Sequence, residues 1–126
     1  MNVPENLKYT KDHEWLKVEN GEALIGITDY AQHELGDIVF IEVETIGEIL
    51  GKGEAFGTIE AVKTVSDMYM PAGGEVLAFN EELTSKPEII NQDPYVKGWI
   101  VRIRIQDPGE IGQLLDAAAY SLQIQG

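Results

Sequence analysis

Short segments of alternating apolar and polar residues, separated by turn residues, dominate this 126-residue chain and indicate a mainly β fold. In the clearest segment, 98–105, three β-branched residues alternate with Arg102 and Arg104. This period of two is typical of an antiparallel strand with one buried face. The length suits one hydrophobic core, and no linker interrupts the pattern. We therefore predict a single domain over residues 1–126.

The first half of the chain predicts a hairpin followed by a short helix. Residues 14–18 and 22–27 flank Asn20-Gly21, a pair that tolerates the positive φ of a tight hairpin turn. Residues 29–35 form a helical candidate that ends at Gly36.

Two further segments are less regular. The alternation over 38–44 predicts Val39 and Ile41 on one face of a strand, with Phe40 and Glu42 on the other. The stretch from Pro87 to Pro94 predicts a loop with one helical turn at most.

The C-terminal segment changes to a helical period. Asp107 is a suitable N-cap, Pro108 fits the first helical position, and Glu110 completes a start similar to a capping box. Apolar residues then recur at helical spacing: Ile111, Leu114, Leu115, Ala118 and Leu122. We predict one helix packed on the sheet, and an architecture that is a small two-sheet sandwich or flattened barrel with a C-terminal helix.

Composition excludes several classes of function. The net charge of −13 disfavours binding to nucleic acid or to an anionic membrane, and it favours a soluble monomer. The absence of cysteine excludes disulfides and thiolate chemistry. His13 and His33 lie too far apart in sequence to suggest a metal site. No apolar run could cross a bilayer, and residues 1–6 lack signal or transit features. We expect a cytoplasmic protein, and less readily a mature mitochondrial-matrix form.

The most informative segment lies around Lys63, where two β-prone runs meet. Two similar fragments, Gly53-Glu54-Ala55 and Gly74-Glu75-Val76, lie at about the same sequence distance before and after this lysine. This arrangement suggests two related half-units joined near Lys63. A lysine in a turn is by default a solvated charge. An attachment lysine must also project from a stiff turn where a modifying enzyme can reach it. We expect Val62 and Val65 to anchor the flanking strands.

The octapeptide Glu60-Ala61-Val62-Lys63-Thr64-Val65-Ser66-Asp67 resembles the lipoyl-attachment motif E-S-V-K-A-[VT]-S-D of glycine cleavage system H proteins. The resemblance runs from about residue 7 to 120. It includes ordered matches at 9–15, 26–32, 35–40, 73–76, 91–95 and 98–99. Ala61 and Thr64 replace residues common in the motif, and Glu34 stands where some relatives have histidine. The resemblance implies a domain of the lipoyl–biotinyl carrier type.

The resemblance implies that the protein is a carrier without catalytic activity and that lipoate is bound covalently to Lys63. This carrier would take the aminomethyl group of glycine from a pyridoxal-phosphate glycine decarboxylase to a tetrahydrofolate-dependent aminomethyltransferase. It would also pass electrons to dihydrolipoamide dehydrogenase. A lipoate ligase, or a lipoyl or octanoyl transferase, would attach the group.

The resemblance also indicates site residues beyond the lysine. By match to the motif positions, Glu14 and Asp67 are candidates for a cleft that holds the loaded arm, with Asp12 as a weaker candidate beside them. Glu60 is a candidate for recognition of the attachment site.

Several alternatives stay open at this point. An H-like protein could mainly relay lipoate to other carriers. A biotinyl carrier usually has methionine on both sides of its lysine, where this chain has Val62 and Thr64. Lipoyl domains of 2-oxo acid dehydrogenases usually show Asp-Lys-Ala in longer chains. A small hydrolase or lyase could use Ser66, Asp67 and His13, but no G-x-S-x-G elbow is present. A purely structural protein would have no modification.

Overall fold

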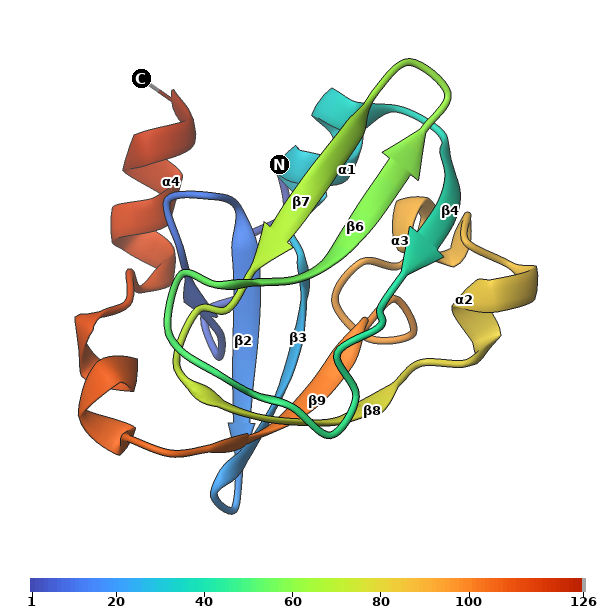
Figure 1. Cartoon of the computed structure of the whole chain (residues 1–126). Helices are drawn as coiled ribbons and strands as arrows, with labels where there is room; N and C mark the ends of the chain where they lie inside the picture. Colours follow the sequence, from blue (N-terminus) through green and yellow to red (C-terminus); the bar gives the residue numbers. More distant parts are fainter. Residues whose placement is uncertain (126) are drawn as a thin grey trace.

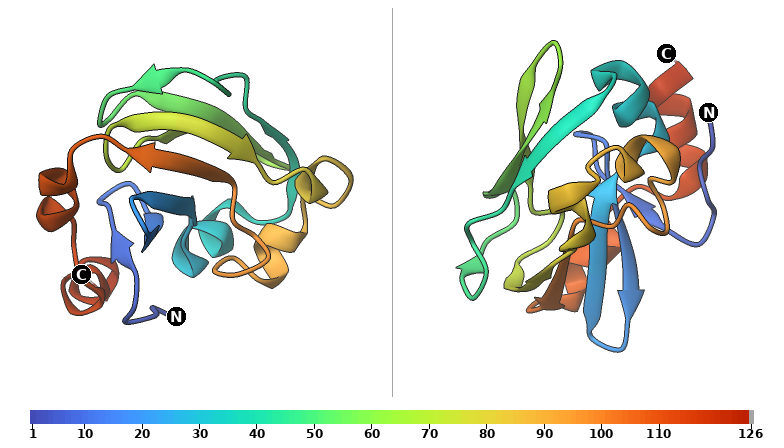
Figure 2. Two further views of the ribbon diagram at one scale, coloured as in Figure 1. Left: turned by 90° about the horizontal axis from the view of Figure 1, so that it is seen from below. Right: turned by 90° about the vertical axis from the view of Figure 1, so that its right-hand side faces the viewer.

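The computed structural model describes residues 1–125, which form two antiparallel sheets with helices at their margins (Figures 1 and 2). The six-stranded sheet contains, in spatial order, β1 (Lys8–Tyr9), β2 (Glu14–Glu19), β3 (Glu22–Ile27), β9 (Val101–Ile105), β8 (Gly74–Phe79) and β5 (Ile49–Leu50). The three-stranded sheet contains β4 (Ile38–Glu42), β6 (Ala55–Ala61) and β7 (Val65–Tyr69) in that order. The predicted mainly β architecture of two sheets is confirmed.

Five short helices complete the fold. They are α1 (Asp29–Leu35), α2 (Glu82–Ser85), α3 (Ile89–Gln92), the 3₁₀-helix η1 (Pro108–Gln113) and α4 (Ala117–Gln125) in the described residues. The single turn α3 lies within the segment that was predicted as a loop with one helical turn. The predicted C-terminal helix is present as α4, at the left in Figure 1.

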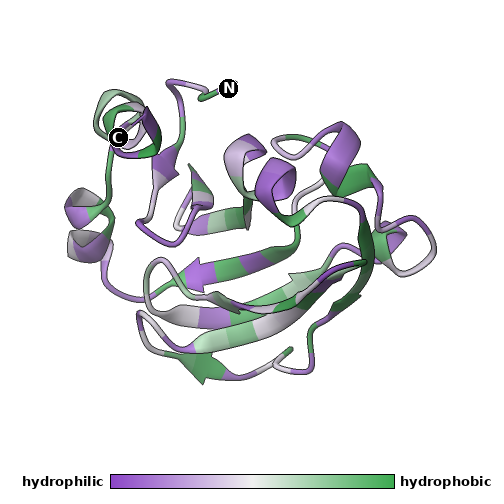
Figure 3. Cartoon of the chain, turned by 90° about the horizontal axis from the view of Figure 1, so that it is seen from above, coloured by the Kyte–Doolittle hydropathy of each residue, from purple (hydrophilic) through white to green (hydrophobic). Residues whose placement is uncertain are grey.

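Apolar residues from both sheets form the main core between them. Hydrophobic positions, green in Figure 3, recur along the strands. Leu16 and Ile25 from the larger sheet join Phe56 and Ile59 from the smaller one in a single buried cluster. Removing this much apolar surface from water is the main source of stability for such a domain. The core therefore fixes how the smaller sheet lies on the larger one.

A second cluster lies on the other side of β2. Trp15 and Leu16 are adjacent in a strand and point to opposite faces. Leu16 enters the main core, whereas Trp15 packs with Tyr9 and Tyr120. Because Tyr120 belongs to α4, this cluster attaches the C-terminal helix to the sheet.

Local signals in the first half of the chain are confirmed. Asn20 and Gly21 have φ values of 52° and 80°, as a two-residue turn between β2 and β3 requires. Helix α1 begins after Thr28, whose hydroxyl accepts a hydrogen bond from the Ala31 amide, and it ends at Gly36 with φ of 80°. These features depend on residues that are neighbours in sequence, which explains why the pattern predicts them.

The predicted faces of the 38–44 strand are wrong in part. The β4–β6 register shifts between Ile38 and Phe40, which marks a β-bulge. As a result Ile38 and Ile41 are buried, whereas Val39 and Phe40 are both exposed. The bulge inserts one residue into the alternation, so Val39 does not share the face of Ile41.

The prediction of one continuous C-terminal helix is also wrong. The chain forms η1, leaves the helix at Leu114, and pairs Leu115 with Tyr9 through two backbone hydrogen bonds of 2.9 Å. Pairing with β1 competes with helix formation at this point. A new helix, α4, then begins with a different buried face, so that Leu122 is 70% exposed. Asp107 does cap η1 by accepting from the Gly109 amide.

Asp116 directly precedes α4, and we predict that its side chain stabilises the protein as the N-cap of this helix. Its Oδ1 accepts a hydrogen bond of 2.8 Å from the Ala119 amide. Asp116→Ala should lower the free energy of unfolding by about 1 kcal/mol, because an N-terminal amide loses its partner. Urea unfolding measures this change. Glu5→Ala also removes one exposed acid but no hydrogen bond among residues 1–125, so an equal loss in that control would contradict the cap.

Candidate lipoyl-attachment site

Lys63 lies at the tip of the β6–β7 hairpin, which projects beside α1 at the top of Figure 1. Residues 62–64 join the two strands, and the Ala61 amide donates a hydrogen bond of 2.8 Å to the Thr64 carbonyl. The Lys63 side chain is exposed. Its amine is therefore open to a modifying enzyme, and the turn that bears it is closed by a backbone hydrogen bond.

The expectation that Val62 and Val65 anchor the strands is wrong. Val62 is 76% exposed and Val65 is 62% exposed. The register pairs Phe40 with Glu60 and Glu60 with Val65, so these three side chains share the outer face of the sheet. Glu60 thus lies between two exposed apolar residues, close to the attachment turn. Anchoring comes instead from the buried residues of β6, such as Ile59 and Ala61.

A cleft of about 280 Å³ lies beside the hairpin, between α1 and β7. We call it the α1–β7 cleft. Its apolar walls are Ile27, Ala31, Leu35, Ile59 and Met68. Its polar residues are Asp12, His13, Glu14, Tyr30, Glu34, Ser66 and Asp67. The cleft therefore combines apolar walls with several carboxyl groups.

Glu14 is the buried carboxyl of this cleft. It begins β2 and is 3% exposed. One oxygen, Oε1, accepts a hydrogen bond of 2.7 Å from the Thr10 hydroxyl, and Oε2 accepts one of 3.1 Å from the Tyr69 amide. Burial raises the pKa of Glu14 to about 7, although both hydrogen bonds oppose that rise. Within residues 1–125 no lysine or arginine pairs with Glu14, so a cationic amine in the cleft would be attracted to it.

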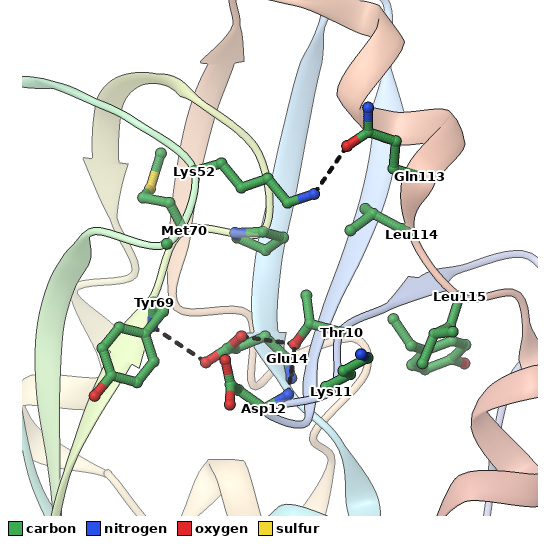
Figure 4. Close-up of a pocket in the computed structure, with 13 residues that line it drawn as sticks. Thr10, Lys11, Asp12, Glu14, Lys52, Tyr69, Met70, Gln113, Leu114 and Leu115 are labelled. Carbon is green, nitrogen blue, oxygen red and sulfur yellow. Dashed lines mark hydrogen bonds between the residues drawn. The ribbon is translucent and has the colours of Figure 1, made fainter.

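Glu14 also borders a second cavity, of about 330 Å³, on its other side (Figure 4). Figure 4 shows the Glu14 carboxyl between Thr10 and Tyr69, while the Lys52 ammonium donates a hydrogen bond of 3.1 Å to Gln113. Sequence reasoning missed this cavity because its walls come from segments far apart in the chain.

The remaining predicted residues lie in different places. Asp67 is exposed on the edge strand β7, and the register aligns it with Thr58 and Glu42 on the outer face. It therefore borders the cleft from its rim. Asp12 is an exposed rim residue that both cavities share. The structure brings Glu14, Asp12 and Asp67 to one cleft, and it places Glu60 outside.

His13 lines the cleft in a way that sequence reasoning did not foresee. It has a left-handed φ of 67°, and its Nδ1 lies 2.8 Å from the Tyr120 hydroxyl. Its ring also packs on Tyr30, with the ring centroids 4.8 Å apart. Burial lowers the pKa of His13, which favours the neutral ring. The α1–β7 cleft is thus connected to α4, an arrangement that no local pattern reveals.

Comparison with known proteins decides the family. The family model described as glycine cleavage H-protein matches residues 7–126. The chain belongs to this family. It is 52% identical over 126 residues to the glycine cleavage system H protein of Bacteroides thetaiotaomicron, with full coverage of both chains. It is 55% identical to that of Salinibacter ruber, with 96% of this chain and 98% of the relative covered.

The fold agrees with a solved structure of the family. The crystal structure of a glycine cleavage system H protein from Mycobacterium marinum matches with a TM-score of 0.90 and 35% sequence identity. The match covers 98% of this chain and 100% of that chain. The H-protein family consists of lipoyl carriers of the glycine cleavage system, so this member is a carrier and not an enzyme. In residues 1–125 no helix is both long and apolar enough to cross a membrane.

Proposed function

We propose that this H protein carries lipoate as an amide on Lys63. The observation on which the proposal depends is the exposed Lys63 amine at the tip of a projecting hairpin, beside a cleft that contains Glu14. The residues fit a lipoyl group: an open amine accepts the acyl chain, and the apolar walls of the cleft suit its hydrocarbon part. When bound, the group supplies a dithiolane that accepts the aminomethyl group of glycine and electrons.

The cleft residues would protect the cargo. Ile27, Leu35 and Met68 are apolar walls of the α1–β7 cleft, so they would keep water from a group bound against them, and exclusion of water suppresses hydrolysis of reactive groups. Glu14 would hold a cationic amine through its buried carboxylate. Asp67 and Asp12 at the rim would add negative charge near the opening. The chain thus supplies attachment, orientation and protection, while its partners perform the chemistry.

As a member of the glycine cleavage system, the protein has the other proteins of that system as partners. In the proposed cycle these are the pyridoxal-phosphate glycine decarboxylase, the tetrahydrofolate-dependent aminomethyltransferase and dihydrolipoamide dehydrogenase. A lipoate ligase, or a lipoyl or octanoyl transferase, would modify Lys63. The net charge of −13 favours encounter with partners whose active-site entrances are basic. Tethering then presents the dithiolane at high effective concentration to a docked partner.

Mass spectrometry of the protein from its native host tests the attachment. We expect an intact mass that includes one lipoyl group, and a digest that maps this group to Lys63. Lys52 and Lys86 are exposed lysines of the same chain and serve as internal controls that should stay unmodified. Protein from lipoate-replete cells without the adduct, or with the adduct on another lysine, would contradict the proposal.

A further inference from the structure

Asn91 in α3 makes three hydrogen bonds: two to the turn that joins α1 to β4 and one to a side chain of α1. Its Oδ1 accepts one of 3.0 Å from the Ile38 amide. Its Nδ2 donates to the Gly36 carbonyl at 2.9 Å and to Oε1 of Gln32 at 3.0 Å. One half-buried side chain thus holds both ends of the Gly36–Ile38 turn.

The turn that Asn91 holds is in contact with the attachment turn. The Val62 amide donates a hydrogen bond of 3.1 Å to the Asp37 carbonyl. This bond continues the β4–β6 pairing beyond Ile38 and Ala61, up to the residue that precedes Lys63. The hairpin tip is therefore bound to the body of the protein through Asp37.

Gly36 adds a second contact with the lysine itself. A Cβ atom at Gly36 would lie 3.5 Å from Cε of Lys63, so the stem of the lysine passes over this glycine. Gly36 also has φ of 80°, a conformation that side chains disfavour. The backbone at Gly36 must hold this shape to leave room for the lysine stem, and Asn91 bonds directly to its carbonyl.

The other side of the hairpin offers less support. Strand β7 is an edge of the three-stranded sheet, and Val65, Ser66 and Asp67 are all exposed. The hydrogen bond from the Val62 amide to the Asp37 carbonyl is the backbone contact that holds the hairpin tip to the α1–β4 turn. If this turn becomes more mobile, the hairpin tip should therefore become more mobile as well.

We propose that Asn91 is a positioning residue for lipoylation: through the Gly36–Ile38 turn it orders the Lys63 turn that the modifying enzyme recognises. This inference rests on the proposed attachment of lipoate to Lys63. An enzyme that binds a loosened tip must order it first, and that cost weakens binding without changing the chemistry of the amine. The effect of removing Asn91 should appear in KM and not in kcat.

The chain offers a matched control in Asn80. Its side chain also makes three hydrogen bonds, to the Lys97 and Trp99 carbonyls and from the Glu82 amide, away from the hairpin tip. Asn91→Ala and Asn80→Ala are compared in two measurements. One is amide hydrogen exchange at Val62 in the unmodified protein. The other is the steady-state kinetics of lipoylation by a lipoate–protein ligase with lipoate and ATP.

We expect Asn91→Ala to speed exchange at Val62 about tenfold relative to Asn80→Ala, because local opening becomes easier. We expect its KM for lipoylation to rise about tenfold with kcat unchanged. Equal effects of the two substitutions, or wild-type values for Asn91→Ala, would overturn the inference. If an alanine variant does not fold, Asn91→Asp and Asn80→Asp decide by the same criteria. Failure of wild-type protein to be modified at Lys63 would instead reject the proposed function.

Discussion

A Lys63→Arg variant should lose lipoylation completely and keep its fold. Acylation requires a neutral amine, and a guanidinium stays protonated and has no such amine. The side chain at position 63 is exposed and makes no hydrogen bond among residues 1–125, so its replacement should change the free energy of unfolding by less than about 0.5 kcal/mol. Intact mass after incubation with ligase, lipoate and ATP measures the first effect, and urea unfolding measures the second.

The same variant should be inactive as a carrier. With the glycine decarboxylase, glycine–bicarbonate exchange should fall to the level seen without carrier. Lys52→Arg is the matched control, because Lys52 is also exposed and the substitution preserves charge; that variant should be modified and active. Wild-type exchange by Lys63→Arg would show that another group carries the cargo.

Glu14→Gln should remove a pH dependence of stability that the buried carboxyl creates. The pKa of Glu14 is raised from 4.5 to about 7 in the folded protein, mainly by burial. Between these values the folded protein retains a proton that the unfolded chain has lost. The stabilisation is therefore complete below about pH 4.5 and is lost as the pH rises through about 7. A pKa shift of this size contributes about 3 kcal/mol to the free energy of unfolding at low pH.

Urea unfolding at about pH 5 and about pH 8 measures this contribution. The wild-type protein should lose about 3 kcal/mol more than Glu14→Gln between the two conditions. The other acids, including the neighbouring Asp12, are present in both proteins, so their effects cancel in the difference. The substitution also disturbs a hydrogen bond to Thr10 or to the Tyr69 amide, but glutamine does not titrate, so position 14 adds no pH dependence in the variant. If the free energy of unfolding changes equally in both proteins between the two pH values, burial does not raise the pKa of Glu14.

The carboxylate should matter for the cargo as well. Hydrogen bonds to charged groups contribute about 1.5–3 kcal/mol. The Glu14→Gln carrier should therefore lose its aminomethyl group about tenfold faster than the wild-type carrier, or faster still. Release of ammonia from the loaded carrier, without the aminomethyltransferase, measures that rate. Asp67→Asn is the comparison at the exposed rim of the cleft, where solvent weakens the attraction. If Asp67→Asn speeds the loss of the aminomethyl group more than Glu14→Gln does, the exposed Asp67 and not the buried Glu14 is the main partner of the amine.

The sequence patterns correctly predicted the structural features that depend on a few consecutive residues. The β2–β3 turn depends on the φ tolerance of Asn20-Gly21, and α1 depends on its cap at Thr28 and its end at Gly36. Each is a property of a few consecutive residues. The position of Lys63 at a hairpin tip was predictable for the same reason, because two β-prone runs meet there.

Predictions failed where a distant segment competes with the local pattern. The C-terminal apolar spacing favours one helix, but the backbone of Leu115 pairs with Tyr9 and interrupts it. The valines beside Lys63 fit an anchoring role by residue type, yet the hairpin projects beyond the core and leaves Val62 76% exposed. Neither outcome depends on residues close in sequence.

By itself, the sequence determined the β character of the chain, the hairpin that bears Lys63 and, through its motif, the family. Only the tertiary structure decided the environment of the site. Glu14 becomes a buried acid because β7 and the loop before β2 enclose it, and Asn91 reaches the α1–β4 turn from 53 residues beyond Ile38. Burial and hydrogen bonding depend on which segments meet in space, whereas strand and turn patterns depend on which residues follow one another.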